Sequence, residues 1–271
     1  MSCVRDARSE FFNGGYVIME TLDTVNIPIR KDETHKGDYG KILLIGGSAN
    51  MGGAIMLAAR ACVYSGSGLI TVATHPNNHA ALHSRCPEAM VIDINDTKML
   101  TKMIEATDSI LIGPGLGVDF KGNNAITFLL QNIQPHQNLI VDGDAIIIFS
   151  KLKPQIPTCR VIFTPHQKEW ERLSGIPIEE QTYERNREAV NNLGATVVLK
   201  QHGTEIYFKD DAYKLSIGTP AMATGGMGDT LAGMITSFVG QFDSLKDAVT
   251  SATYTHSYIG EKLSESMYVV P

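Results

Sequence analysis

Residues 41–73 read KILLIGGSANMGGAIMLAARACVYSGSGLITVA and contain the pattern that decides the fold. The apolar run Lys41–Ile45 ends at two glycines, and a stretch with helical apolar spacing, Ala54–Tyr64, follows it. A second apolar run, Leu69–Ala73, completes the unit. Strands that are apolar throughout and alternate with helices are typical of a parallel α/β fold, in which helices cover both faces of the sheet.

The same alternation continues along the rest of the chain. Further strands are predicted at Ser109–Ile112, Asn138–Val141, Arg160–Phe163 and Thr196–Leu199. Helices are predicted at Asp96–Ala106, Gly122–Asn132, Gln167–Ser174, Glu180–Leu193, Gly226–Gly240 and Ser244–Ser264. The runs Glu205–Phe208 and Ala212–Ser216 indicate a small antiparallel hairpin. No Pro-rich or Ser-rich linker divides the chain, so residues 19–271 are expected to form a single domain, and residues 1–18 a possible disordered extension.

Composition excludes several classes of protein. The chain has 271 residues and a formal net charge of −6, which argues against nucleic acid as a partner because such binding depends on clustered basic residues. No apolar stretch is long enough to span a membrane, so no membrane association is expected. The four cysteines (Cys3, Cys62, Cys86 and Cys159) are scattered without a C-x-x-C pair, which favours a reducing, cytoplasmic location.

Two glycine-rich loops follow predicted strands, where open α/β sheets bind their ligands. The first, Gly46–Ala54, reads GGSANMGGA, and the second, Gly113–Gly117, reads GPGLG. Glycine allows a positive φ angle and a close approach of the backbone to a ligand, although a plain strand-to-helix turn is the alternative for both loops. The chain has neither the Walker A nor the dinucleotide-binding glycine fingerprint.

A third candidate loop pairs a histidine with a carboxylate. His166 and Glu169 lie three residues apart and are expected on one face of the helix that starts there. A carboxylate at this position could order Mg²⁺ through water, and an ordinary structural helix start is the alternative.

The glycine loop at residues 223–233, ATGGMGDTLAG, carries the strongest signal. Glycines lead into a helix whose first turn contains Asp229, so free N–H groups and the positive end of the helix dipole form an anion pocket there. Asp229 can then act as general base on a hydroxyl that attacks phosphorus, while the amides of Gly225, Gly226, Met227 and Gly228 hold the phosphoryl oxygens as an anion hole. The alternative is that Asp229 only stabilises the helix electrostatically. The loop Lys200–Thr204 adds a cation and a hydroxyl for an adenosine phosphate.

Together the motifs resemble the NAD(P)H-hydrate dehydratase family. The resemblance rests on six segments in order, from about Pro28 to Gly260: HKGDYGKILLIGGSANMGGAIMLAARACVYSGSGLITVAT, GPGLG, VDGDAI, FTPHQKEWERL, VVLKQHGTEI and GTPAMATGGMGDTLAGMI. It implies a ribokinase-like three-layer sandwich with a central, mostly parallel sheet flanked by helices.

The resemblance also implies an activity, which is repair of the hydrated forms of NADH and NADPH. A stand-alone bacterial member would be a hydro-lyase that dehydrates (S)-NADHX and (S)-NADPHX with ADP and releases AMP and phosphate; with ATP, the nucleotide product would be ADP. Mg²⁺ is the implied cofactor, a homotetramer the implied assembly, and an NAD(P)H-hydrate epimerase the implied functional partner.

Carried over position by position, the resemblance assigns residues to roles. Asp229 is the implied catalytic residue. The implied hydrate contacts are Ala54, Gly117, His166 and Asp229, and the implied nucleotide contacts are Lys200, Gln201, His202, Gly203, Thr204 and Gly228. Gln201 replaces a common glycine of the family, and His166 takes the place of an asparagine that precedes the metal-linked glutamate in ribokinase relatives; Glu169 is that glutamate here.

Two other functions share these sequence features. A small-molecule kinase of the same fold, of the thiazole or hydroxymethylpyrimidine type, would have a similar glycine-rich Asp loop but would leave a stable phosphorylated product. A nucleotide-binding regulator without activity is the other. An assay with hydrated NADH and ADP separates the dehydratase from the kinase.

Overall fold

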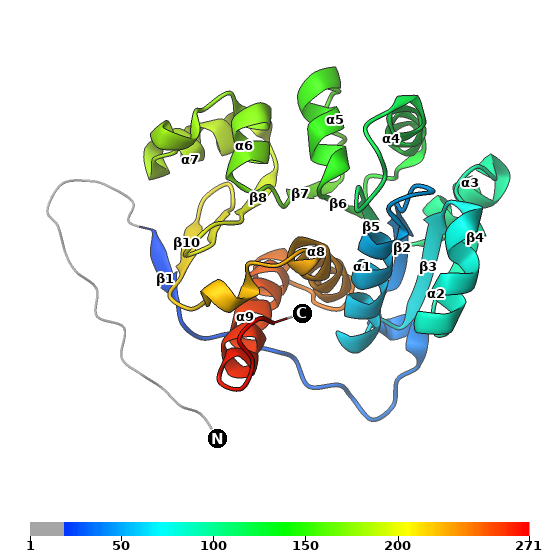
Figure 1. Ribbon diagram of the computed structural model, residues 1–271, viewed down its shortest axis with the longest axis horizontal. Helices are drawn as coiled ribbons and strands as arrows, with labels where there is room; N and C mark the ends of the chain where they lie inside the picture. The colour runs from blue at the N-terminus through cyan, green and yellow to red at the C-terminus, as the bar shows by residue number, and fades with distance from the viewer. Residues whose placement is uncertain (1–18, 271) are drawn as a thin grey trace, which may run out of the picture.

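The computed structural model describes residues 19–270, and these residues form one ten-stranded sheet between two layers of helices (Figure 1). The strand order across the sheet is β1-β10-β9-β8-β7-β6-β5-β2-β3-β4. The proposed extension at residues 1–18 lies outside the described residues. No helix within residues 19–270 is both long and apolar enough to cross a bilayer.

The strands, in chain order, are β1 (Glu20–Leu22), β2 (Lys41–Ile45), β3 (Leu69–Thr74), β4 (Met90–Asp93), β5 (Ser109–Ile112), β6 (Asn138–Val141), β7 (Arg160–Phe163), β8 (Thr196–Leu199), β9 (Glu205–Tyr207) and β10 (Ala212–Leu215). The helices are α1 (Gly52–Tyr64), α2 (His79–Arg85), α3 (Thr97–Ala106), α4 (Phe120–Asn132), α5 (Asp144–Leu152), α6 (Gln167–Ser174), α7 (Tyr183–Leu193), α8 (Met227–Val239) and α9 (Leu245–Ser264).

The three-layer prediction is confirmed, because alternate residues of the central strands enter two separate cores. In β2, Ile42 and Leu44 pack with α1, α8 and α9 on one face, and Leu43 and Ile45 pack with α3, α4 and α5 on the other. Successive side chains of a strand point to opposite faces, so a strand that is buried on both faces must be apolar throughout.

The parallel strands place their carboxyl ends along one edge of the sheet, called the carboxyl edge below. Strands β2 to β8 pair in parallel, whereas β9 pairs antiparallel with both β8 and β10, which confirms the small hairpin. The loops singled out in the sequence at residues 46–54, 113–117, 164–169 and 200–204 all follow strands at this edge.

Some elements were not predicted, and some predicted boundaries were wrong. The sequence-based prediction lacked β1, α2, β4 and α5, and it began α7 at Glu180, whereas the helix begins at Tyr183 after its N-cap Thr182. Helix α5 carries three successive isoleucines, which favour strands on local propensity; burial of Ile146 and Ile148 against the sheet stabilises the helix instead.

A close crossing of α1 and α8 places the glycine loop before α8 over the sheet. A Cβ atom added to Gly233 would lie 2.4 Å from the backbone oxygen of Ala58, so only glycine allows the two helices to pack at this distance. Gly226, just before α8, has a φ of 95°, which turns the chain into the helix.

Candidate active site

The first turn of α8 presents an open helix N-terminus. Gly226 occupies the N-cap position, and no side chain within residues 19–270 caps it. The first helical backbone hydrogen bond runs from the Thr230 N–H to the Gly226 carbonyl, at 2.9 Å. The amides that precede Thr230 therefore have no helical acceptor and are available for an anion.

Asp229 lies half-buried in this turn, and its pKa is raised to about 6. Burial is the main cause, the negative charges of Asp142 and Asp144 add to it, and the positive charge of Lys200 opposes it. A carboxylate with a pKa near 6 is ionised at neutral pH and is a stronger base than an exposed aspartate, as general-base catalysis requires.

Lys200 brings the predicted nucleotide loop to the same turn. It follows β8, and its Nζ donates to Oδ1 of Asp142 at 2.7 Å. A Cβ atom added to Gly228 would lie 3.1 Å from this Nζ, so the ammonium group lies directly beside the first turn of α8. Burial alone would lower the Lys200 pKa, but the charges of Asp142 and Glu169 outweigh it, and the pKa is raised.

His166 and Glu169 form a reciprocal helix cap at the start of α6. The His166 Nδ1 atom accepts from the backbone N–H groups of Lys168 (3.1 Å) and Glu169 (3.3 Å), and the Glu169 carboxylate accepts from the His166 N–H at 2.8 Å. Burial and the positive charge of Lys200 lower the His166 pKa, so the imidazole is neutral and Nδ1 can accept. His166 and Glu169 therefore cap the start of α6, as the structural alternative in the sequence analysis predicts. The His166 side chain is still 52% exposed and accessible to a ligand.

The glycine loops on the other side of this turn are also held close together. The Gly117 N–H donates to the Asp144 carboxylate at 2.8 Å. A Cβ atom added to Gly115 would lie 3.2 Å from the Cβ of Ala54, which places the two glycine loops in contact. A cavity of about 520 Å³ borders Gly117, and both glycine loops and the start of α4 line it.

Most of the predicted site residues therefore meet at the carboxyl edge. Gln201, in the loop predicted to bind the nucleotide, accepts a hydrogen bond from Gln167 of α6 at 3.0 Å, and the Thr204 hydroxyl donates to the Gln201 carbonyl. Gly203 has a φ of 68°, which suits a glycine at this turn.

Two predicted site residues are not brought to the first turn of α8 by any contact. His202 and Gly225 are exposed, and the structure shows no contact of either residue with Asp229.

Asp142 and Asp144 contact the predicted site residues Lys200 and Gly117, and sequence reasoning did not single them out. Both belong to the VDGDAI segment, which the resemblance included without assigning it a role. The available signal was a pair of carboxylates directly after the buried strand β6, at the edge where ligands bind.

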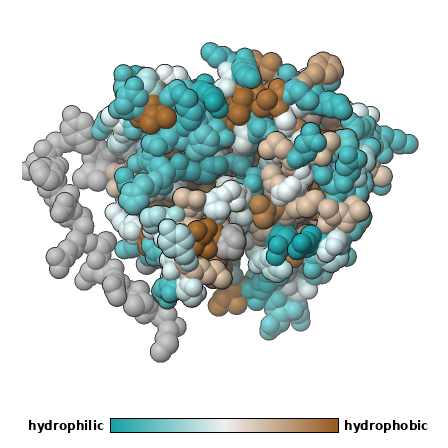
Figure 2. All heavy atoms as spheres, in the orientation of Figure 1, coloured by the Kyte–Doolittle hydropathy of each residue, from teal (hydrophilic) through white to brown (hydrophobic). Residues whose placement is uncertain are grey.

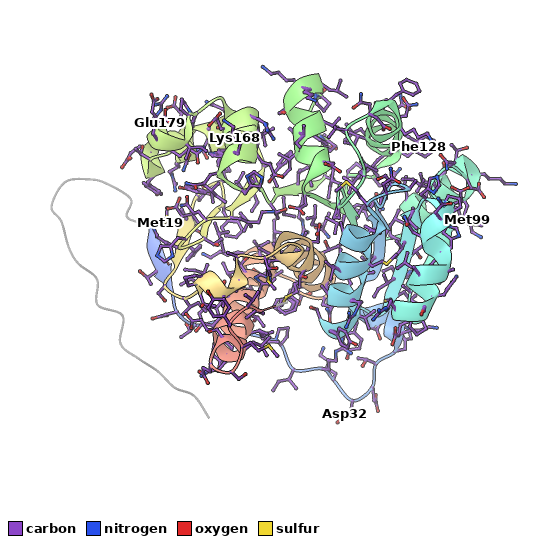
Figure 3. The ribbon with its side chains drawn as sticks, viewed as in Figure 1. Met19, Asp32, Met99, Phe128, Lys168 and Glu179 are labelled. Carbon is purple, nitrogen blue, oxygen red and sulfur yellow. The ribbon has the colours of Figure 1, made fainter. Side chains whose placement is uncertain are left out.

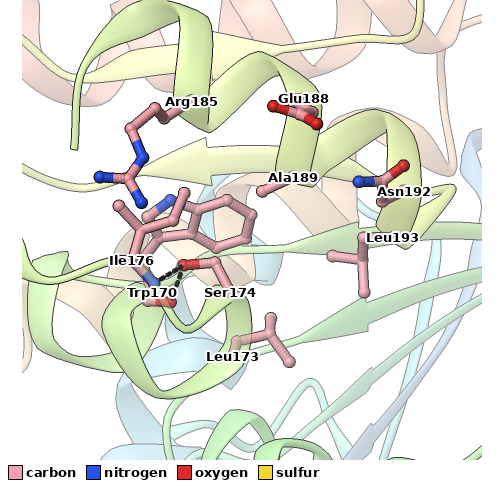
Figure 4. A pocket seen from close by; sticks show the side chains of 9 residues that line it. All are labelled: Trp170, Leu173, Ser174, Ile176, Arg185, Glu188, Ala189, Asn192 and Leu193. Carbon is pink, nitrogen blue, oxygen red and sulfur yellow. Dashed lines mark hydrogen bonds between the residues drawn. The ribbon is translucent and has the colours of Figure 1, made fainter. Parts of the chain in front are cut away.

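A second pocket lies away from these residues. Figure 4 shows a pocket of about 350 Å³ between α6 and α7, lined by Trp170, Leu173, Ser174, Ile176, Arg185, Glu188, Ala189, Asn192 and Leu193. Ser174 satisfies its own helix end by donating to the Trp170 carbonyl and accepting from the Ile176 N–H. None of the predicted site residues lines this pocket. Lys168 of α6 and Phe128 of α4 mark the helix layer that contains it (Figure 3).

Comparisons with known sequences all point to NAD(P)H-hydrate dehydratases or repair enzymes. A sequence model of a family described as NAD(P)H-hydrate dehydratase matches residues 42–271. The chain is 87% identical to an ADP-dependent (S)-NAD(P)H-hydrate dehydratase of Staphylococcus aureus (strain NCTC 8325 / PS 47), over 95% of this chain and 94% of that protein. It is 37% identical to a bifunctional NAD(P)H-hydrate repair enzyme of Vibrio cholerae, over 85% of this chain and 46% of that protein.

Solved structures agree with the fold. A ribokinase-like superfamily protein from Enterococcus faecalis V583 has a TM-score of 0.88 and 45% identity, covering 90% of this chain and 87% of its own. The ADP/ATP-dependent NAD(P)H-hydrate dehydratase of Bacillus subtilis, co-crystallised with ATP/Mg²⁺, has a TM-score of 0.81 and 31% identity, covering 90% and 88% of the two chains. The expected ribokinase-like fold is therefore confirmed.

Proposed function

The chain belongs to the NAD(P)H-hydrate dehydratase family, and from this premise we propose that it repairs hydrated nicotinamide dinucleotides at the first turn of α8. It is an ADP-dependent hydro-lyase that converts (S)-NADHX and (S)-NADPHX to NADH and NADPH and releases AMP and phosphate. The observation that carries the proposed site is Asp229 beside an uncapped helix N-terminus, with the Lys200 ammonium against Gly228.

The reaction begins with phosphoryl transfer to the hydrate. Asp229 takes the proton of the ring hydroxyl, whose oxygen then attacks the terminal phosphorus of ADP, and the bond from that phosphorus to the bridging oxygen breaks to release AMP. The amides of Gly225, Gly226, Met227 and Gly228 stabilise the charge on the transferring group. Hydroxide is a poor leaving group, so this step makes the later elimination possible.

The second step restores the nicotinamide ring. The lone pair of the ring nitrogen expels phosphate as the carbon–oxygen bond breaks, and the neighbouring carbon then gives up a proton to the released phosphate or to water, which forms the double bond. Ala54, Gly117 and His166 would hold the hydrate for both steps. Lys200, Gln201, His202, Gly203, Thr204 and Gly228 would hold the adenine nucleotide.

Mg²⁺ fits this site as an ion bound mainly by the nucleotide. Within residues 19–270 no three His, Cys, Asp or Glu side chains are grouped to hold a metal ion. Mg²⁺ commonly keeps several waters and uses one or two carboxylates together with substrate phosphates. Glu169 is such a carboxylate, and we assign it an indirect contact through water. The ion would offset negative charge on the phosphates.

The size of the site favours a dinucleotide over a small vitamin precursor. The cavity of about 520 Å³ beside Gly117 adds space beyond the reacting centre, and Lys121 and Asn50 line it. The substrate of a thiazole or pyrimidine kinase is small and would not need this additional cavity. A hydrated dinucleotide is larger, and its second nucleotide requires space outside the reacting centre. The kinase alternative is thus the weaker one.

Oligomerisation into a homotetramer is proposed on the basis of exposed apolar side chains. Tyr64 of α1 is 80% exposed, and Ile259 of α9 is 45% exposed. Both line a groove of about 450 Å³ between α1, α8 and α9. On the face shown in Figure 2, apolar residues lie in small areas among hydrophilic ones. Light scattering coupled to size-exclusion chromatography would report the assembly.

Further proposals concern the cellular setting and the domain. The buried cysteines Cys62, Cys86 and Cys159 are free thiols, which suits a reducing compartment such as the cytoplasm. An NAD(P)H-hydrate epimerase would supply the S epimer, in keeping with the bifunctional name of the Vibrio cholerae relative. Residues 19–271 would act as a single catalytic domain.

The decisive experiment is a spectrophotometric dehydratase assay. Purified protein is incubated with hydrated NADH, Mg²⁺ and either ADP or ATP, and the return of the absorbance of reduced nicotinamide is followed. Recovery that is faster with ADP is expected. A stable phosphorylated product without recovery would instead establish the kinase, and no reaction by correctly folded protein would remove both.

A further inference from the structure

We propose that Asp142 is a positioning residue that holds the Lys200 ammonium group against the terminal phosphate of the nucleotide at the first turn of α8. The proposal rests on the proposed function for the identity of the nucleotide. It concerns an interaction that spans three strands at the carboxyl edge.

The geometry of the pair is specific. Asp142 follows β6, Thr164 follows β7 and Lys200 follows β8. The Oδ1 atom of Asp142 accepts from both the Thr164 hydroxyl and Lys200 Nζ, each at 2.7 Å. Neighbouring strands lie about 4.8 Å apart, so the lysine side chain reaches across the end of β7 to the carboxylate.

A purely stabilising role explains this arrangement poorly. Asp142 is only 2% exposed and Thr164 is fully buried. Removing two opposite charges from water costs about as much as their attraction returns, so a buried ion pair is weak evidence for a role in stability. Its location beside the proposed catalytic turn instead favours a role in orienting the cation.

The ammonium group also has capacity left for a ligand. Lysine has three N–H donors, and within residues 19–270 the only hydrogen bond of the Lys200 Nζ is the one to Asp142. The remaining donors lie beside Gly228, at the uncapped end of α8. A phosphate held by the helix amides would meet them, and the phosphate closest to Asp229 is the one being transferred.

The same pair also influences the proposed base. The charged groups that act on Asp229 are Asp142 and Asp144, which raise its pKa, and Lys200, which lowers it. His256 of α9 packs against the Met227 end of this turn, and because burial lowers its pKa to about 4, it is uncharged at neutral pH. Removing the Asp142 charge should therefore lower the Asp229 pKa and move the acid limb of the activity profile to lower pH.

The test compares ADP with AMP, because only ADP carries the phosphate that Lys200 would contact. Calorimetric titration of Asp142→Asn should show ADP binding weakened about 10- to 100-fold, the value of one charge-assisted hydrogen bond, with AMP binding nearly unchanged. Asp211→Asn is the matched control, because Asp211 also accepts from a lysine, Lys246, at 2.8 Å, but at the hairpin turn of the opposite edge. It should leave both affinities at wild-type values.

Each outcome decides the proposal. Equal weakening of ADP and AMP would mean a structural role, and no weakening of ADP would mean that Lys200 does not need Asp142; either result overturns it. An acid limb that stays at the wild-type pH in Asp142→Asn would overturn it as well. If that variant does not fold, Lys200→Gln must give the same selective loss of ADP. Binding needs no hydrate, so a chain that binds ADP selectively but lacks dehydratase activity would contradict the proposed function alone.

Discussion

His166 and Glu169 cap the same helix from opposite directions: Nδ1 of His166 accepts from the Glu169 N–H, and the Glu169 carboxylate accepts from the His166 N–H. This reciprocal cap accounts for both residues without any ligand. The imidazole Nε2 lies 3.5 Å from the Glu169 carboxylate, and about half of the His166 side chain (52%) is exposed. The capping role and a role in hydrate binding can therefore be separated experimentally.

The first prediction separates those two roles. His166→Ala should lose about 1 kcal/mol of folding stability because it removes an N-cap, whereas His166→Asn should keep the cap and the stability. If the imidazole also touches the hydrate, both variants should raise the KM for the hydrate with little change in the KM for ADP. An asparagine variant with a wild-type KM for the hydrate would limit His166 to capping.

The second prediction concerns the proposed base. Asp229→Asn should lower kcat by about 10²- to 10⁴-fold, the usual contribution of a general base, and should retain ADP binding. Single-turnover kinetics and calorimetry measure the two quantities. A variant that keeps turnover would show that another group takes the proton, and lost ADP binding would indicate damage to the anion pocket.

The third prediction follows from the raised pKa of Asp229. In the wild-type protein, activity should fall about tenfold per pH unit below pH 6, because the carboxyl group becomes protonated near its pKa of about 6. This loss of activity below pH 6 should be absent from the pH profile of any residual activity of Asp229→Asn. A pH profile that is flat from 7 down to 5 would contradict the assignment.

The fourth prediction links the same pKa to stability. The folded-state pKa of Asp229 is raised from 3.8 to about 6, so the native state binds this proton more tightly than the unfolded chain does. The free energy of unfolding therefore falls as the pH rises from about 4 to 6. Above pH 6 this group causes no further loss, because Asp229 is then ionised in both the native and the unfolded state. Asp229→Asn should stabilise the protein at pH 7.5 by about 1 kcal/mol, a value discounted for partial exposure, and the gain should vanish below pH 4. Thermal unfolding at both pH values measures it.

The fifth prediction uses two helical glycines with opposite surroundings. Gly233→Ala should destabilise the protein by about 1–3 kcal/mol, because the new Cβ would meet the Ala58 carbonyl at 2.4 Å. Gly53→Ala in α1 has nothing within 4 Å of its new Cβ and should be neutral or stabilising by up to about 1 kcal/mol. Urea denaturation of both variants measures the change in the free energy of unfolding and shows whether it has opposite signs. Equal effects would mean that the α1–α8 crossing is looser than described.

Much of this molecule follows from local sequence. The apolar runs at Lys41–Ile45 and Asn138–Val141 have the length and composition of strands covered on both faces, and both are strands. The start of α8 was also predictable to within one residue, because glycines and Asp229 mark a helix N-terminus by their own conformational and electrostatic preferences. Helix α5 was missed because its isoleucines favour a strand locally and only packing against the sheet makes them helical.

What the sequence determined by itself was the parallel α/β class, most of the strands and helices along the chain, and the glycine-rich turns between them, because these depend on residues that are neighbours along the chain. Only the tertiary structure decided that Asp142 and Lys200, 58 residues apart, would meet at 2.7 Å beside Gly228. That contact depends on β6, β7 and β8 lying next to one another in parallel, which places their carboxyl ends along a single edge. No local preference encodes the strand order, since it arises from burial of both sheet faces under helices. The environment that raises the Asp229 pKa therefore belongs to the fold rather than to the motif.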